Sequence, residues 1–335
     1  MNSPTTSPYP QSMSARDRWI LAQRAHAAPS DLARSELDPQ RPQAFLVEDE
    51  RAENGEVLPV ATLFLTNREC PWRCLMCDLW RNTLLQTTPR GAIPKQIAYA
   101  LARLPFARQI KLYNSGSFFD PKSIPPEDYA GIAARVHTFE RVIVECHPAL
   151  LGQSCLRFRD LLNGSREVQL EVAMGLETAQ PQVLAQLNKR MTLDQFARAA
   201  AFLRANAIAL RVFILVKPPF MEEAEALHWA QRSLDFAFDC GATAAALIPT
   251  RLGNGALEAL AARGEFSPPK LATLEAALEY GLAQKRARVF ADLWDLQRCN
   301  ACSHCFPGRA VRLHEMNLQQ TIPAPIPCRH CGERN

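Results

Sequence analysis

Six short apolar runs recur along the chain, and segments with helical periodicity separate them at intervals of about thirty residues. The runs are nearly continuously apolar, which is typical of parallel strands that are buried on both faces. Strand and helix alternation predicts parallel βαβ units. Six units are too few for a closed eight-stranded barrel, so the predicted fold class is α/β with an open, partial (βα)6 barrel. The predicted strands are residues 59–66, 109–113, 141–146, 168–174, 210–216 and 242–249.

Two further segments flank this alternation. AFLVEDE and VLPVATLFLT are separated by a turn with Asn54-Gly55, which predicts a β-hairpin. Residues 1 to about 40 are rich in Ser, Pro and Gln and have one helical patch near Arg16–His26, so we expect a frayed leader there. The predicted domains are an N-terminal extension with a hairpin strand (1–55), the partial barrel (56–290) and a Cys-rich C-terminal metal-binding module (291–335).

Composition restricts the class of protein. The chain has 335 residues, 47% apolar and 21% charged, as expected for a soluble globular enzyme. A net charge of +4 is compatible with nucleic-acid binding without arguing for it. The N-terminus does not resemble a secretory signal, and no apolar run is long enough to span a membrane. We therefore expect a cytoplasmic protein with no membrane contact, in which clustered cysteines hold metal rather than form disulfides.

The predicted strands end in small, polar or charged residues. Asn114, Ser115, Gly116 and Ser117 follow the second strand. Glu145 ends the third strand, and a Gly-Leu-Glu-Thr stretch with Glu177 follows the fourth. Because carboxyl ends of parallel strands meet at one edge, a ligand site is predicted there.

Three cysteines, Cys70, Cys74 and Cys77, follow the first barrel strand with Cys-x3-Cys-x2-Cys spacing. Thiolates select zinc and iron–sulfur clusters. A structural zinc site and a ferredoxin-type cluster each take four protein ligands, and this loop offers three. A cubane held by three cysteines keeps one iron open to a small molecule. The alternatives are a zinc knuckle with a distant ligand and a chance grouping.

Five more cysteines lie near the C-terminus. Cys302, Cys305, Cys328 and Cys331 form two CxxC pairs and predict a closed four-thiolate site of the zinc-ribbon type. Cys299 is then spare, or it replaces one ligand of an auxiliary iron–sulfur cluster. His304 and His330 are expected to point outward. The module is either a basic handle for nucleic acid or a structural clamp on the barrel. The remaining cysteines, Cys146, Cys155 and Cys240, are expected to pack as small buried hydrophobes.

The cysteine loop, placed directly after the first strand of a partial barrel, resembles that of the radical S-adenosylmethionine (SAM) superfamily. This resemblance implies a [4Fe-4S] cluster on Cys70, Cys74 and Cys77, with the open iron chelated by the amino and carboxylate groups of SAM. An electron from the reduced cluster then breaks the sulfonium C–S bond, and the resulting 5′-deoxyadenosyl radical abstracts hydrogen from substrate.

The resemblance also implies roles for other residues. Residues 114–117 occupy the place of the family's Gly-Gly-Glu turn, which meets the methionyl amino group. The glutamate is absent here, so backbone and the Ser115 or Ser117 hydroxyl would serve. Glu145 and Glu177 are placed for the ribose hydroxyls or the amino group, and Arg190 for the methionyl carboxylate. Met76 and Trp72 flank the cluster ligands. Each of them either shields the cluster, contacts adenine or only packs against apolar residues.

A longer series of stretches resembles the radical subunit of archaeosine synthase, from about Ala61 to the C-terminus. That family acts on tRNA whose 7-deazaguanine carries a lysine, and it cleaves a C–N bond to leave a formamidine. It implies a lysine-transferring partner subunit and a low-potential electron donor. DNA or a free nucleoside is an alternative substrate. Rival functions are a sulfur-inserting, methylthiolase-like modifier that uses a second cluster, an iron–sulfur electron carrier and a nucleic-acid-binding metalloprotein. The stretches are TNRECPWRCLMCDLW, KLYNSGSFFDP, FERVIVECHPALLG, LEVAMGLET, LNKRMTLDQF, FILVKPPF, IPTRLGNGA and FADLWDL.

Overall fold

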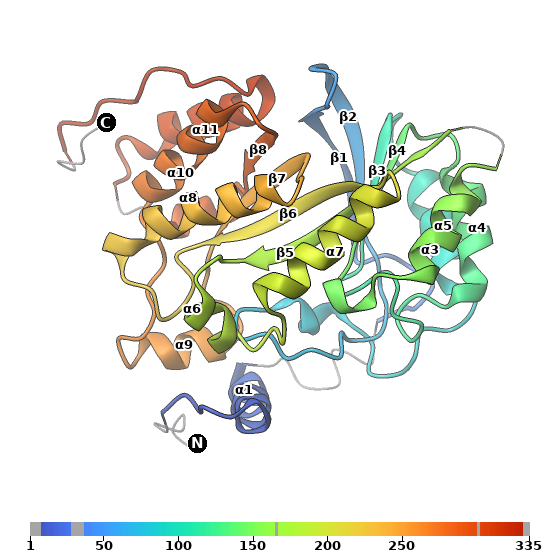
Figure 1. Ribbon diagram of the computed structural model, residues 1–335, viewed down its shortest axis with the longest axis horizontal. Helices are drawn as coiled ribbons and strands as arrows, with labels where there is room; N and C mark the ends of the chain where they lie inside the picture. The colour runs from blue at the N-terminus through green and yellow to red at the C-terminus, as the bar shows by residue number, and fades with distance from the viewer. Residues whose placement is uncertain (1–7, 28–36, 165–166, 300–301, 331–335) are drawn as a thin grey trace.

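A single curled sheet organises the molecule. The structure, a computed structural model, describes residues 8–27, 37–164, 167–299 and 302–330. Its eight strands lie in the order β1 to β8, with β1 antiparallel to β2 and all later neighbours parallel (Figure 1). The strands are β1 (Ala44–Arg51), β2 (Val57–Phe64), β3 (Gln109–Tyr113), β4 (Arg141–Glu145), β5 (Gln169–Glu177), β6 (Ala209–Val216), β7 (Ala244–Pro249) and β8 (Arg288–Ala291).

Helices connect the parallel strands and cover the outer face of the sheet (Figure 1). Among the described residues, no helix is both long and apolar enough to cross a membrane. The α-helices are α1 (Met13–Ala27), α3 (Ala92–Leu101), α4 (Tyr129–Val136), α5 (Gln153–Leu162), α6 (Pro181–Gln186), α7 (Leu193–Ala205), α8 (Glu223–Asp239), α9 (Ala256–Ala261), α10 (Leu271–Gln284) and α11 (Phe306–Gln319). Short 3-10 turns are η1 (Leu79–Asn82), η2 (Pro126–Asp128), η3 (Pro148–Leu150) and η4 (Leu296–Cys299).

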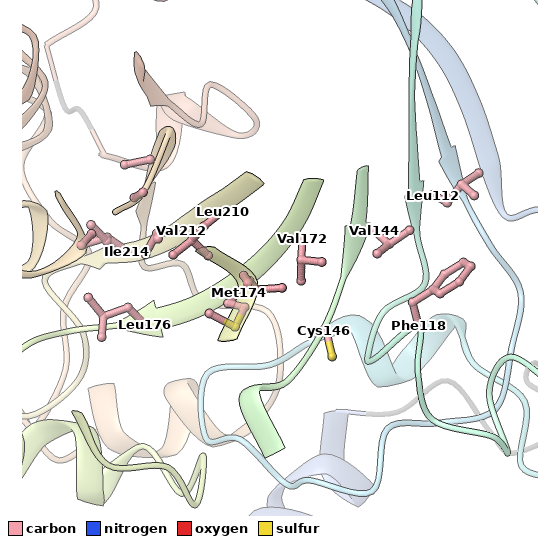
Figure 2. Packing of buried hydrophobic residues seen from close by; sticks show 14 of the residues in the cluster. Leu112, Phe118, Val144, Cys146, Val172, Met174, Leu176, Leu210, Val212 and Ile214 are labelled. Atoms are coloured by element: carbon pink, nitrogen blue, oxygen red, sulfur yellow. The ribbon is translucent and has the colours of Figure 1, made fainter. Parts of the chain in front are cut away.

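The hydrophobic core lies between the sheet and these helices. Successive side chains of a strand point to opposite faces, so every second residue of each strand enters this core. Leu112 of β3, Val144 of β4 and Val172 of β5 are fully buried neighbours in it (Figure 2). Cys146 and Cys155 are buried in the same core, as predicted, whereas Cys240 is only half-buried.

The strand residues that alternate with these core residues form the inner face of the curled sheet. Near the amino ends of the strands, these inner residues are charged. Glu171 of β5 is fully buried and pairs with Arg211 of β6 at 2.6 Å and with Arg141 of β4 at 2.5 Å. Glu50 of β1 pairs with Arg211 at 2.6 Å and with Lys111 of β3 at 2.5 Å. These contacts join β1 to β6 across the interior, so ion pairs close the curl where no strand pairing does.

All six predicted barrel strands are confirmed, and so is the hairpin of β1 and β2. The capping box of Thr192 and Gln195 is present at the start of α7. Gly241 directly follows the C-cap of α8 with a φ of 91°. The sheet has one more parallel strand than predicted, because β8 has only four residues and shows no readable periodicity. The division at residues 55 and 290 stays a prediction.

The expectation of a frayed leader is wrong for residues 8–27. Trp19 and Ile20 of α1 and the preceding Tyr9 are buried in a cluster with Leu257 and Leu260 of α9. The helical patch near Arg16–His26 lies within α1, and only the long-range contact with α9 shows that its apolar residues are buried. As a result, α1 lies beside α9 and below the sheet in Figure 1.

Replacing Glu171 tests whether ion pairing holds the curl together. Burial alone would raise the pKa of Glu171, but Arg211, Arg288 and Arg141 outweigh it and lower the pKa from 4.5 to about 2. Glu171→Gln removes the carboxylate that the buried guanidinium groups of Arg211, Arg288 and Arg141 share, so the free energy of unfolding in urea falls by about 3–5 kcal/mol at neutral pH. The stabilisation is complete above pH 4.5 and lost towards pH 2, so the difference from the native chain shrinks on acidification.

The exposed Glu48 of β1 provides the control, since no salt bridge joins it to any residue that the structure describes. Glu48→Gln changes the unfolding free energy by less than about 0.5 kcal/mol. Equal losses in both variants would contradict the assigned role of the network.

Candidate functional site

The three cysteines of the predicted cluster loop lie between β2 and η1, at the carboxyl edge of the sheet. Contacts from distant segments fix the loop. Leu75 N donates to Leu187 O at 2.9 Å, and the buried Asn254 amide donates to Leu75 O at 2.7 Å. Within the loop, Arg73 Nη1 donates to Cys70 O at 2.6 Å. The backbone is therefore held from the β5 side and the β7 side at once.

The thiols of Cys70, Cys74 and Cys77 converge closely enough for the charge of each to affect a neighbour's pKa. Burial raises the pKa of each to about 12, so metal binding must displace protons. In the described part of the chain, three ligand atoms all within 4.8 Å of one another occur only in the C-terminal cysteine group, so at least two of the Cys70, Cys74 and Cys77 sulfur atoms stand further apart than this.

The turn after β3 lies directly against the cluster loop. A Cβ added to Gly116 would lie 3.2 Å from Cys70 Cβ, so a larger residue would press on the loop. Asn114 N donates to Glu145 Oε2 at 2.9 Å. Burial raises the pKa of Glu145 to about 7, against the opposing effect of backbone N–H groups of Asn114, Gly116 and Ser115. The side-chain amide of Asn114 is fully buried and has no hydrogen-bond partner among the residues that the structure describes, as expected where a bound group completes a site.

A buried ion pair faces the same loop from β5. Lys189 Nζ lies 2.6 Å from Glu177 Oε1, and the positive charge of Lys189 lowers the pKa values of Cys70 and Cys74. Gly175 makes room for the pair, because a Cβ there would overlap the Glu177 carboxylate and lie 2.6 Å from Lys189 Nζ. A glycine is required at this position for packing rather than for backbone freedom.

His147 closes the site beside Lys189. Its ring stacks on Trp72 of the cluster loop with centroids 3.9 Å apart, and its Nε2 contacts Lys189 O at 3.0 Å. Burial and the Lys189 charge lower the pKa of His147 to about 3, so the ring is neutral at physiological pH. Its backbone N donates to Ser117 Oγ at 2.8 Å, which joins the turn after β3 to the turn after β4. The Ser117 hydroxyl, a predicted contact of the methionyl amino group, thus already accepts a hydrogen bond from His147 N.

Known proteins that are similar to this chain include two archaeosine synthase subunits. No family model matches the chain. It is 24% identical over 228 residues to archaeosine synthase subunit beta of Methanosarcina acetivorans, covering 65% of each chain. It is 27% identical over 208 residues to the subunit of the same name from Thermococcus kodakarensis, covering 59% of this chain and 63% of the relative. An uncharacterized protein of Methanocaldococcus jannaschii is 23% identical over 274 residues, 76% of this chain and 73% of that one. The matches span just under two thirds of the two named subunits.

Among solved structures, methylornithine synthase, a radical SAM enzyme, superposes with a TM-score of 0.50 at 13% identity, covering 97% of this chain and 85% of that one. The chain has the radical SAM fold. The predicted fold class and the resemblance to archaeosine synthase subunit beta are thereby confirmed. The relatives and the fold together support a radical SAM enzyme.

In this radical SAM fold, Lys189 faces the thiols of the cluster loop, and the predicted Arg190 points towards α1. Arg190 has an exposed side chain, pairs with Asp17 of α1 and has a φ of 58°. Asn188 also has a positive φ, and the two turns direct Lys189 inward. Lys189 and Arg190 are adjacent basic residues in the sequence. Their periodicity therefore does not show which of the two faces the cluster loop. Met76 is half-buried against the apolar clusters of α9 and α6, which fits the packing alternative for this residue.

The N-terminal helix contributes a cation that the sequence did not reveal. Arg24 of α1 is 4% exposed, donates to Glu69 Oε1 at 3.2 Å and to Cys74 O at 3.4 Å, and lies 5.2 Å over the Trp80 ring. Burial lowers the pKa of Arg24, and the nearby Cys77 thiolate opposes this shift. Its positive charge is therefore positioned to compensate negative charge on the cluster ligands.

Aromatic rings line the inner face above the charged layer. Phe64 of β2, Tyr113 of β3 and Phe213 of β6 are half-buried, with neighbouring ring centroids 6.4 and 6.1 Å apart. Trp294, which follows β8 and is 57% exposed, lies 6.0 Å from Phe64. The row runs from half-buried rings to the exposed Trp294, so it offers aromatic surfaces on which a planar ligand could stack.

The C-terminal cysteines form a separate group. The sulfur atoms of Cys302, Cys305 and Cys328 lie within 4.8 Å of one another, as the predicted metal site requires. Cys331 lies outside the described residues. The His304 and His330 rings are exposed and stack on each other at 3.9 Å, outside this sulfur group as predicted. Cys299 is 7% exposed and packs in the main core rather than in the group.

Lys189 and Arg190 can be distinguished by their effect on SAM binding. Lys189→Gln removes the cation that faces the cluster loop, so we expect SAM to bind about ten- to a hundredfold more weakly to the reconstituted protein. Arg190→Gln removes only a surface pair with Asp17 and should change the dissociation constant less than about twofold. Equilibrium binding measured by calorimetry checks both values. The reverse order of effects would identify Arg190, as the resemblance implies, as the residue that pairs with the methionyl carboxylate of SAM.

Proposed function

We propose that this protein is a radical SAM enzyme that acts on a lysine-bearing 7-deazaguanine in tRNA and cleaves a C–N bond to leave a formamidine. The named relatives support this choice, because both carry the name archaeosine synthase subunit beta. The observation that carries the radical chemistry is the loop of three cysteines held against the Gly116 turn at the carboxyl edge of the sheet.

The chain's own residues provide the binding site. Cys70, Cys74 and Cys77 would hold a [4Fe-4S] cluster, which when bound would supply the electron that splits the C–S bond of SAM. Lys189 is placed for the methionyl carboxylate, and a Lys–carboxylate contact would compete with its present partner Glu177. Glu145 brings a carboxylate to the turn that lacks the family's glutamate and so replaces it towards the amino group. The half-buried Trp72 and neutral His147 exclude water beside them.

The inner face favours a planar aromatic substrate. Stacking of a nucleobase on an aromatic side chain contributes about 1–3 kcal/mol, and the row from Trp294 to Phe213 provides several such surfaces. Charged pairs lie near the outer end of this row, where Arg251 contacts both Asp292 and Trp294 O. A base with a zwitterionic amino-acid substituent matches this combination of stacking surface and paired charges.

Other components of the proposal come from the resemblance. They are tRNA as the macromolecular partner, a lysine-transferring subunit that prepares the substrate, a low-potential electron donor, a second metal in the C-terminal module and a cytoplasmic location. The module is basic, with five Arg against two Glu over residues 298–335, which suits contact with phosphates.

Sulfur insertion is the second candidate, since it needs an auxiliary cluster and the chain has a second cysteine group. That group is spaced for one ion rather than for a cubane, which favours C–N cleavage.

Reductive cleavage of SAM tests the radical chemistry without knowledge of the substrate. We expect the anaerobically reconstituted, reduced protein to form 5′-deoxyadenosine, and Cys74→Ala to lose this activity by more than about a hundredfold because the cluster loses a ligand. Chromatography of the nucleoside products measures it. Cys240→Ser is the control, because Cys240 is half-buried on the outer side of the sheet. Absence of 5′-deoxyadenosine from a fully loaded sample would favour an electron carrier or a nucleic-acid-binding metalloprotein.

Nucleoside analysis identifies the substrate. Cells without the gene should accumulate a lysine-bearing 7-deazaguanine nucleoside in tRNA, and the formamidine product should disappear. Mass spectrometry of digested tRNA, DNA and free nucleosides separates the three possible substrates. An accumulating precursor in DNA would move the proposal to that polymer, and an unchanged profile in all three pools would refute the C–N cleavage assignment.

A further inference from the structure

The C-terminal sulfur group has the dimensions of a single-ion site. Cys302 Sγ and Cys328 Sγ lie 3.6 Å apart, and Cys305 Sγ lies within 4.8 Å of both. Two thiolates on one tetrahedral zinc ion at 2.3 Å stand about 3.8 Å apart. Cysteines that bind different irons of a cubane stand roughly 6 Å apart. The spacing therefore matches zinc and is too short for an auxiliary cluster.

The fold brings Cys328 back to the other two cysteines. Cys302 and Cys305 precede α11, whose fourteen residues are about 21 Å long. Gln320 ends the helix with a φ of 53°, and the Pro-rich stretch to Cys328 follows. Eight residues of extended polyproline-like chain cover about 25 Å, enough to retrace the helix. Ile326 packs 3.3 Å from where a Gly308 Cβ would lie, so the tail does run back along α11.

The surroundings of the sulfur group suit a negatively charged thiolate site. Arg309 is 6% exposed, and its Nη1 lies 3.9 Å from Cys305 Sγ. The same guanidinium pairs with Glu275 of α10 at 2.7 Å, which fixes its position. Donors of this kind orient and stabilise metal-bound thiolates. Arg312 holds the returning tail through Pro323 O at 2.8 Å.

The helix between the cysteines completes the last edge of the sheet. The Gln320 amide accepts from Val289 N at 2.7 Å and donates to Val289 O at 2.8 Å. The Asn317 amide does the same with Ala291 N and O, both at 2.8 Å. Two side chains thereby occupy the positions that a further strand would take beside β8. The position of α11 thus determines how the sheet ends.

The segment between β8 and the sulfur group crosses the open side of the half-barrel. We define this strap as residues 292–299. Its Trp294 contacts Phe64 of β2, near the opposite edge of the sheet from β8. Its Arg298 donates to Leu252 O at 2.9 Å. Leu296 and Cys299 are buried in the main core. The strap is thus tethered by β8 at one end and by the cysteine loop that begins at Cys302 at the other.

We propose that Cys302, Cys305 and Cys328 bind a structural zinc ion, and that this ion anchors the strap across the open side of the half-barrel. The zinc ion joins the loop after the strap to the tail that lies along α11. It thereby fixes the exposed Trp294 over the aromatic row. This role is independent of the reaction assigned to the cluster loop, and Cys331, the fourth ligand expected from the CxxC spacing, lies outside the described residues.

Metal analysis of the full-length chain tests the ion. We expect about one zinc per chain, retained in Cys70→Ala/Cys74→Ala, in which iron is lost. Zinc should be lost in Cys302→Ser/Cys305→Ser and retained in the control Cys240→Ser. About four additional irons per chain in place of zinc, removed by Cys302→Ser/Cys305→Ser, would overturn the assignment.

Hydrogen exchange tests the anchoring, and it does not require the serine variants to fold. Zinc is withdrawn from the folded native protein with a chelator, and exchange is followed by mass spectrometry. Exchange across residues 292–299 should accelerate at least about tenfold, whereas β4 and β5 stay protected. Re-addition of zinc should restore protection. Unchanged exchange of the strap after complete zinc removal would show that the ion does not anchor it.

Discussion

Side-chain alternation along β2 to β8 is the constraint on which the rest of this structure depends. Every second residue of each strand enters an apolar core beneath the helices, and the residues between them face the interior of the curled sheet. The two edges of a half-barrel are not joined by strand pairing. Near the amino ends of the strands, charged residues fill the interior instead. Glu171 and Glu50 are shared among cations from several strands, so the floor is rigid and polar. The carboxyl ends, above the aromatic layer, are left for ligands.

Around that opening, residues from remote parts of the chain converge on one short loop. Arg24 comes from the N-terminal helix, Asn254 from the segment after β7 and Lys189 from the segment after β5. Each either binds the loop backbone or places positive charge near its thiols. Because burial holds the thiol pKa values near 12, metal capture and this positive charge act together to favour the thiolate form. The loop thus presents three thiols beside two buried cations, Arg24 and Lys189.

The sequence was informative where a pattern repeats or a spacing is chemically restrictive. The six strands, the partial barrel and the cysteine loop could all be predicted in this way. Features that depend on long-range contacts could not be predicted. The four residues of β8 show no period, and α1 owes its place to burial of Trp19 and Ile20 against α9. Lys189 and Arg190 are neighbours of the same charge, and only the positive φ values on either side of Lys189 decide which one faces inward.

The central claim is that Cys70, Cys74 and Cys77 hold a cluster with one iron that no protein ligand caps. Electron–nuclear double resonance on the reduced, reconstituted protein with SAM labelled by 15N and 17O in its methionyl group tests this claim most directly. The account predicts hyperfine coupling of both labels to the cluster, at strengths that indicate direct coordination. A spectrum unchanged by SAM, together with a signal from a fourth protein ligand, would contradict it.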